Sequence, residues 1–163
     1  MPPATQIDTD FELLIPDDYV SSSIERLRLY NTLTSVKSEE ELVSFAASLN
    51  DRFGQAPRQV VELMDSIRLK WKTSMLGVER LFMKRGVMRL YFPEDSSSAF
   101  FSSDVFSRIL SWVASHGKDC HLEEKSMKSG RLALILKVDD VKTLPRAIKI
   151  INSLYDSAVV EDK

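Results

Sequence analysis

The segment GVERLFMKRGVMRLYFP, residues 77–93, marks a change of hydrophobic period in this 163-residue chain. Before it, apolar residues recur every three or four positions, which is the spacing of one face of a helix. Within it, two short apolar and aromatic runs flank a turn that contains Gly86, and Pro93 follows the second run. Such runs predict a β-hairpin. Helices followed by hairpins are typical of the α+β class, which is the predicted fold class.

Three helices are predicted before this segment. The first begins near Ser23, and the second begins at Ser38, which forms a capping-box pattern with a glutamate three residues later. Gly54 suits the end of the second helix, because glycine readily adopts the left-handed conformation. Pro57 suits the first turn of the third, where its missing N–H would be unpaired anyway. The third helix is predicted to end at Gly77.

The later part of the chain adds a second hairpin between two more helices. Residues 102–117, SSDVFSRILSWVASHG, predict a helix, and CHLEEKS (120–126) and RLALILKV (131–138) predict two strands. The second of these strands is nearly all apolar, which favours a place inside the sheet. A final helix is predicted to open at Asp139 or Asp140. We expect the helices to pack on one face of an antiparallel sheet.

These elements predict one α+β domain over residues 11–158. Its helical part is residues 17–77, and its sheet-containing part is residues 78–158. Residues 1–10 have no hydrophobic period, and we expect them and residues 159–163 to be disordered tails.

Composition and charge exclude several classes of protein. With 44% hydrophobic residues the chain can build a core, and its formal net charge of −2 gives no large field to attract nucleic acid or an anionic membrane. The single cysteine, Cys120, cannot pair within the chain, so we expect a reducing, cytoplasmic location. No apolar stretch is long enough to span a bilayer, and we expect no membrane partner.

The sequence contains no motif of a catalytic or cofactor site. Glycine-rich phosphate-binding loops are absent, and there are only 5 glycines. His116, Cys120 and His121 are metal-ligating residue types, but their spacing matches no zinc motif, so we expect no metal. There is no nucleophile elbow to accompany the 2 histidines. We therefore expect a chain that is not an enzyme and holds no cofactor.

The segment DRFGQAP, residues 51–57, places an acid and a base at the junction of the second and third helices. Phe53 continues the apolar face of the second helix. Arg52 suits the negative C-terminal end of a helix, whereas Asp51 has the wrong sign for that position. Asp51 is therefore predicted either to cap the turn, which is the commoner role of a short aspartate, or to contact a partner.

A second candidate surface is basic. It would contact phosphates, with Trp71 as a stacking platform for bases. Trp71 also continues the apolar stripe of the third helix, which favours a packing role for it and a solvated face for the lysines. The basic residues of this candidate surface are Arg68, Lys70, Lys72, Lys84 and Arg85.

Three segments together resemble a known family. They are LLIPDDYVSSSIERLRLY (residues 13–30), LNDRFGQAPRQVVELM (49–64) and LGVERL (76–81), and they are similar to the C-terminal domain of the bacterial transcription-repair coupling factor. The resemblance covers about Phe11 to Phe92. It implies a fragment of a large cytoplasmic protein whose ATP-driven motor moves on DNA and removes stalled RNA polymerase. ATP is then expected at the motor of the parent and not in this chain.

The resemblance also implies a regulatory role without catalysis. In that family the C-terminal domain packs against an N-terminal module that resembles UvrB, and it masks the surface that recruits UvrA until the motor engages. Asp51 and Arg52 would lie on that contact surface. The family often has an acid where this chain has Ser48, which implies a weaker ionic contact here. The implied function is autoinhibition in transcription-coupled DNA repair, and the alternative is a nucleic-acid-binding accessory domain of a DNA translocase.

Overall fold

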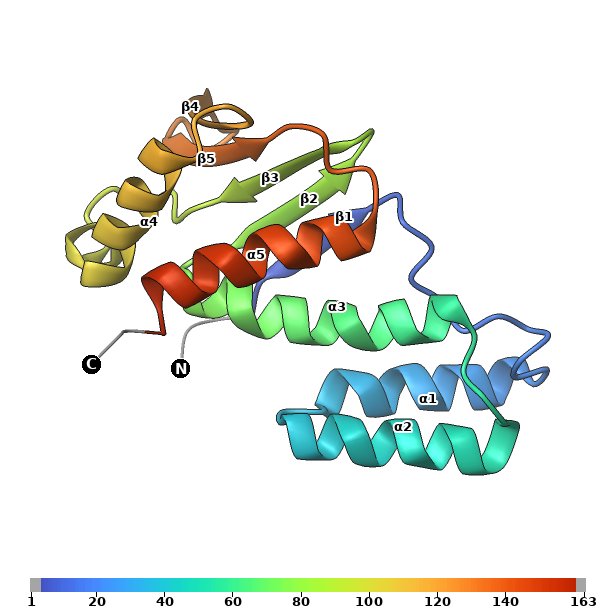
Figure 1. Ribbon diagram of the computed structural model, residues 1–163. Helices are drawn as coiled ribbons and strands as arrows, with labels where there is room; N and C mark the ends of the chain where they lie inside the picture. Colours follow the sequence, from blue (N-terminus) through green and yellow to red (C-terminus); the bar gives the residue numbers. More distant parts are fainter. Residues whose placement is uncertain (1–3, 161–163) are drawn as a thin grey trace. The chain divides into compact units, whose positions relative to one another are not determined.

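The computed structural model describes residues 4–160 of the chain (Figure 1). The ends, residues 1–3 and 161–163, were predicted to belong to disordered tails, and they lie outside the described residues. The described part forms two compact units.

The first of these, the helical unit, comprises Glu12–Arg68. The second, the sheet unit, comprises the residues up to Phe11 and those from Leu69 onward. The division falls inside helix α3 (Arg58–Met75), so the last turns of that helix belong to the sheet unit. The helical part of the fold had been predicted to end later, at residue 77.

The helical unit contains α1 (Ser23–Ser35), α2 (Glu39–Phe53) and the first turns of α3. The three predicted helices are confirmed, because their start signals act locally. Ser38 Oγ accepts a hydrogen bond from the backbone N of Glu41 at 3.2 Å, as expected of a helix-capping serine. The buried apolar side chains of α1 and α2 recur at helical spacing. They are Leu29, Leu33, Leu42, Phe45 and Leu49.

In the sheet unit, five described strands form one mixed sheet in the order β1-β2-β3-β5-β4. The two predicted hairpins are confirmed, since β2 pairs antiparallel with β3 and β4 pairs antiparallel with β5. Strand β1 pairs parallel with β2 and makes the sheet mixed. The strands are β1 (Gln6–Thr9), β2 (Arg80–Lys84), β3 (Val87–Tyr91), β4 (Cys120–Ser126) and β5 (Leu132–Val138).

The disordered tail predicted for residues 1–10 is wrong for β1. Gln6 N donates to Glu79 O at 2.9 Å, and Thr5 Oγ1 donates to Val78 O at 2.7 Å. A short edge strand needs no hydrophobic period of its own, because the neighbouring strand supplies its hydrogen bonds. The sequence pattern of residues 1–10 therefore carried no sign of β1.

The helices of the sheet unit lie on one face of the sheet (Figure 1). On that face, Leu81, Leu90 and Leu136 occupy one row across β2, β3 and β5, and each is 0% exposed. The residues between them along each strand point to the other face, because side chains alternate in a strand. The covering elements include a short 3-10 helix, η1 (Ala99–Ser102), α4 (Asp104–Ser115) and α5 (Leu144–Ala158).

The last helix begins later than predicted. Thr143 caps α5 by accepting a hydrogen bond from Arg146 N at 3.2 Å, so the predicted opening at Asp139 or Asp140 is wrong. Asp140 instead has a left-handed backbone with φ 58° in the turn before the helix. The next residue, Val141, donates its N–H to Gly86 O at 2.7 Å. A contact with the distant β2–β3 turn therefore holds this segment out of the helix.

Candidate functional site

Helix α2 ends without help from Asp51. Gly54 has φ 85°, and its N–H donates to Asn50 O at 3.0 Å. The Tyr19 hydroxyl donates to Gly54 O at 2.8 Å. The Asp51 side chain is exposed and makes no hydrogen bond or ion pair within residues 4–160. The local-cap interpretation of Asp51 is therefore wrong, and its side chain is free for another surface.

Arg52, by contrast, is held within the helical unit. Its Nη2 donates to the Glu25 carboxylate of α1, and its Cζ lies 4.7 Å from the centroid of the Phe53 ring. Arg28 approaches the same carboxylate at 3.7 Å. Although 46% of the Arg52 side chain is exposed, its guanidinium is already oriented. A partner that binds Arg52 must share it with Glu25 or displace Glu25.

A groove of about 480 Å³ runs between α1 and α2. Thr32 and Ser35 of α1 line it, as do Ser44 and Ser48 of α2. Ser48 and Arg52 are four residues apart, so they lie on the same row of the helix. Ser48 therefore continues the row of Arg52. We define the α1–α2 surface as Glu25, Arg28, Thr32, Ser44, Ser48, Asp51 and Arg52.

Two tyrosines, Tyr19 and Tyr30, make hydrogen bonds within the helical unit. The Tyr30 hydroxyl accepts a hydrogen bond from Ile15 N at 2.7 Å. Besides its bond to Gly54, Tyr19 packs on Phe53 with ring centroids 5.8 Å apart. Burial raises the pKa of Tyr19 above 10.0, which favours the neutral, donating hydroxyl. These two side chains tie the segment before α1 to the helices.

Tyr19→Phe is expected to lower the free energy of unfolding of the helical unit by about 1 kcal/mol, because the hydrogen bond from the Tyr19 hydroxyl to Gly54 O is lost. Since the folded pKa of Tyr19 is raised, its stabilisation is present below about pH 10 and is lost above it. Urea unfolding at neutral and alkaline pH measures both effects.

Tyr155→Phe is the matched control for Tyr19→Phe. The Tyr155 ring lies beside Lys72, and its hydroxyl makes no hydrogen bond within residues 4–160. Its loss is expected to change stability by less than about 0.5 kcal/mol. Equal losses in the two variants would contradict the role assigned to the Tyr19 hydroxyl.

The basic candidate residues are divided between the two units. Arg68, in the helical unit, forms a two-pronged ion pair with Glu39 at 2.7 and 2.8 Å and a further bond to Asp65 at 2.8 Å. The hydrogen bond from Arg68 holds the pKa of the Glu39 carboxyl below its usual value. Arg68 is therefore occupied within its own unit, and a phosphate would have to compete with two carboxylates.

The other four basic residues belong to the sheet unit. Lys72 Nζ donates to Asn152 Oδ1 at 2.5 Å, and Lys84 Nζ lies 3.5 Å from Asp8 Oδ1. Arg85 occupies the β2–β3 turn with φ 54°. Lys70 lies on α3, where it is half-buried. Trp71 is half-buried as well, in agreement with the packing role favoured for it.

His116, Cys120 and His121, the candidate metal ligands near the start of β4, each have different neighbours. The His116 ring stacks on Trp112 with centroids 3.9 Å apart, and His121 Nε2 lies 3.1 Å from Asp139 Oδ2. Cys120 is buried, and burial raises the pKa of its thiol, with Asp119 and Asp139 adding to the shift. Within residues 4–160, no group of three or more histidine, cysteine or acidic side chains is placed to hold a metal ion.

None of the described helices combines the length and the apolar character that a membrane span requires.

Comparison with known proteins identifies the family. The TRCF domain family matches residues 9–102, which is more than half of the chain. The chain is 34% identical to the transcription-repair-coupling factor of Escherichia coli (strain K12) over 77 residues, 47% of this chain and 7% of that protein. It is 25% identical to the corresponding protein of Rickettsia typhi over 152 residues, 92% of this chain and 12% of that protein. The chain thus spans a small part of the length of these relatives.

A solved structure has the same fold. The crystal structure of the C-terminal domain of transcription-repair coupling factor superposes with a TM-score of 0.63 at 18% sequence identity, and the match covers 98% of each chain. At this identity the likeness establishes the fold. Together with the match over residues 9–102, it shows that the chain belongs to the TRCF domain family, the C-terminal domain of transcription-repair coupling factor.

Proposed function

We propose that this chain is an autoinhibitory domain of a transcription-repair coupling factor. Its α1–α2 surface contacts the N-terminal UvrB-like module of the same protein and masks the surface that recruits UvrA in transcription-coupled DNA repair. RNA polymerase and DNA are then engaged by other parts of the parent, and ATP is used by the motor of the parent. Membership in the TRCF domain family supports a role in transcription-coupled repair. The charged α1–α2 surface supports a contact with the N-terminal module.

The observation that carries the proposal is the position of Asp51. An acid at the C-terminal end of a helix is unfavourable, because it meets the negative end of the helix dipole. Asp51 stays exposed there and has no polar partner within residues 4–160. Beside it, Glu25 and Phe53 hold Arg52 in place. An exposed acid next to an oriented guanidinium fits a contact with a complementary pair on another surface.

The polarity of this surface fits a contact that must open. Glu25, Arg28, Asp51 and Arg52 carry two negative and two positive charges. Because exposed pairs of this kind contribute little each, the contact can be released without a large cost. A coupling of roughly 1–3 kcal/mol between the two modules changes the ratio of closed to open molecules about 5- to 150-fold. Salt weakens such a contact by screening.

The test reverses the pair in the full-length parent protein. In the Asp51→Arg, Arg52→Glu variant, UvrA capture in the absence of DNA and ATP is expected to rise at least about fivefold, because the masked surface becomes available. A pull-down with purified UvrA measures it. Higher ionic strength is expected to raise capture by the unmodified protein as well.

The control reverses an ion pair elsewhere in the helical unit. Arg58 and Glu62 form an ion pair at 3.2 Å on α3, outside the α1–α2 surface. Arg58→Glu with Glu62→Arg leaves the net charge unchanged, and UvrA capture is expected to stay at its original level. If the Asp51 and Arg52 reversal also leaves capture unchanged, while circular dichroism shows an intact fold, the α1–α2 surface is not the inhibitory contact.

A further inference from the structure

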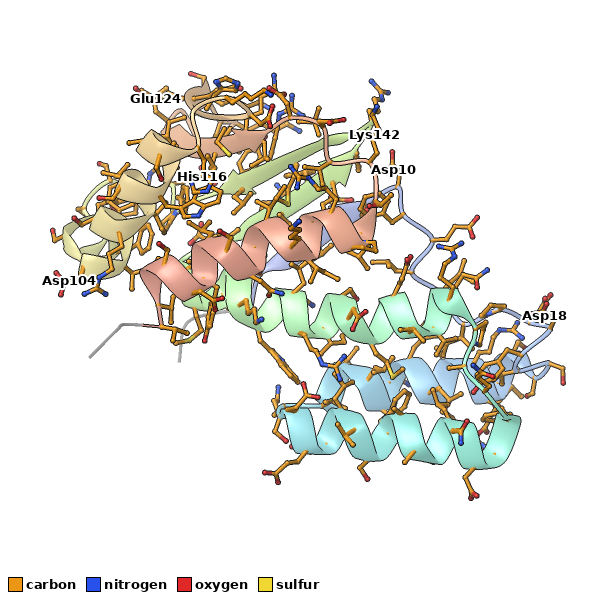
Figure 2. The ribbon with its side chains drawn as sticks, viewed as in Figure 1. Asp10, Asp18, Asp104, His116, Glu124 and Lys142 are labelled. Atoms are coloured by element: carbon orange, nitrogen blue, oxygen red, sulfur yellow. The ribbon has the colours of Figure 1, made fainter. Side chains whose placement is uncertain are left out.

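The sheet unit contains a pocket of about 390 Å³ between the end of α4, the start of β4 and one side of α5. This volume is at the lower end of the roughly 300–1,000 Å³ that is typical of small-molecule sites. Figure 2 labels His116, which lines the pocket at the end of α4. The apolar lining consists of buried side chains from four elements. They are Trp112, Cys120, Val138 and Ile150.

The charged lining of this pocket is mostly basic. Lys118, Arg146 and Lys149 contribute three positive charges and Asp119 one negative charge, so the pocket carries +2 with His116 neutral, in a chain of net charge −2. None of the three cations forms an ion pair within residues 4–160. Arg146 and Lys149 are one turn apart on α5 and therefore lie on the same side of that helix. Three cations against a single carboxylate, Asp119, favour binding of an anion.

The stacked rings of His116 and Trp112 line the same pocket as these cations. The rings of His116 and Trp112 are 3.9 Å apart and nearly parallel, with an angle of 16° between their planes. His116 Nδ1 lies 2.7 Å from Trp112 O, and Trp112 Nε1 donates to Ser153 Oγ at 3.1 Å. Trp112 covers one face of the exposed imidazole, so the other face is left for a planar group of a ligand. Planar aromatic groups stack favourably in this way.

Two other cavities in the described part of the chain have no positive charge in their lining. The groove between α1 and α2 is lined by Glu40 and Glu41 and by no cation. A cavity of about 650 Å³ beside Gly77 is lined by Glu79 and Asp95, again with no cation. An anionic ligand is therefore disfavoured in both, whereas the pocket between α4 and α5 combines positive charge with an aromatic ring.

We propose that the pocket between α4 and α5 binds a nucleotide phosphate, with the base stacked on His116 and the phosphate held by Arg146 and Lys149. Lysine and arginine are suited to phosphate oxygens, and arginine can bind two of them at once. A base joined to a phosphate in this way occurs both in a free mononucleotide and in a single nucleic-acid strand. The proposal concerns the sheet unit alone and does not depend on the autoinhibitory contact of the helical unit.

The test titrates the ¹⁵N-labelled chain with thymidine 5′-monophosphate and follows amide and indole signals by NMR. The Trp112 indole N–H is expected to shift saturably, while the indole of Trp71, the other tryptophan, serves as an internal reference. Thymidine, which lacks the phosphate, is expected to bind at least about tenfold more weakly, because the charge-assisted bonds are lost. Equal affinity for thymidine and its monophosphate would overturn the assignment of the phosphate to Arg146 and Lys149.

Paired variants separate the pocket from general charge. Arg146→Ala with Lys149→Ala is expected to weaken binding of the monophosphate at least about tenfold. The control, Lys128→Ala with Arg131→Ala, removes one lysine and one arginine from the β4–β5 turn outside the pocket, and its affinity is expected to stay unchanged. Lys149→Gln tests the same phosphate contact if the double pocket variant does not fold. Equal weakening in the pocket and control variants, or no saturable shift of the Trp112 indole, overturns the proposal.

A single-stranded oligothymidylate distinguishes the two sources of the ligand. Tighter binding of the strand than of the mononucleotide, lost again in the pocket variant, identifies a strand as the ligand. Equal binding of the two identifies a free nucleotide. Because the variants in this test lie in the sheet unit and those in the UvrA test lie in the helical unit, each proposal succeeds or fails independently of the other.

Discussion

Leu136→Ala is expected to lower the free energy of unfolding of the sheet unit by about 2–5 kcal/mol. Leu136 is 0% exposed on β5, where it stands in a row with Leu90 and Leu81 beneath the helices. Shortening it removes buried apolar surface and leaves a cavity that the surrounding strands cannot fill completely. Urea unfolding followed by circular dichroism measures the loss.

Leu132→Ala makes the same chemical change on the same strand. Leu132 is 56% exposed, so its truncation is expected to change stability by less than about 0.5 kcal/mol. The difference between the two variants isolates the contribution of burial from any general effect on β5. Similar losses at both positions would mean that the row of Leu136 is not part of the core.

Gly77→Ala is expected to destabilise the sheet unit by about 2–5 kcal/mol, through backbone strain and overpacking together. Gly77 has φ 77°, a conformation that costs a residue with a Cβ atom. A Cβ at this position would lie 2.3 Å from Phe100 Cε1, so the Phe100 ring must move. That ring is stacked on Phe92 at 5.6 Å and packs against Phe106 at 5.3 Å, which restricts its movement.

Gly130→Ala separates the two causes. Gly130 has φ 84°, but a Cβ there would have no heavy atom within 4 Å other than those of Gly130 and its two chain neighbours. Its substitution therefore introduces the backbone strain alone, which is about 1–2 kcal/mol. Thermal unfolding of both variants gives the difference that the Phe100 contact contributes. Equal losses for Gly77→Ala and Gly130→Ala would show that the Phe100 ring moves aside at no cost.

The helices and hairpins were predictable because their signals are local. The serine at position 38 and the glycine at position 54 act within a few residues of themselves, and they bound α2 as the sequence indicated. The strand β1 was not predictable, because its hydrogen bonds come from a strand more than seventy residues away. The start of α5 was misplaced for a similar reason, since Val141 is held by the distant Gly86.

The candidate site shows the same division. The sequence indicated that Asp51 and Arg52 stand at a helix end, and it singled out the acid as unfavourable there. It did not indicate that the Tyr19 hydroxyl would donate to Gly54 O, or that Asp51 would have no local role. It also did not indicate that Arg52 would bind Glu25, a residue of the preceding helix.

By itself, the sequence determined the order of the helices and hairpins and the α+β class, since caps, turns and hydrophobic period operate over a few neighbouring residues. The resemblance of three of its segments indicated the family. Only the tertiary structure brought Lys118 to the same pocket as Arg146 and Lys149, and only it placed the His116 ring on Trp112 beside them. Side chains from separate elements meet according to how the helices pack on the sheet. That packing depends on the topology of the whole chain, so no short segment of the sequence predicts it.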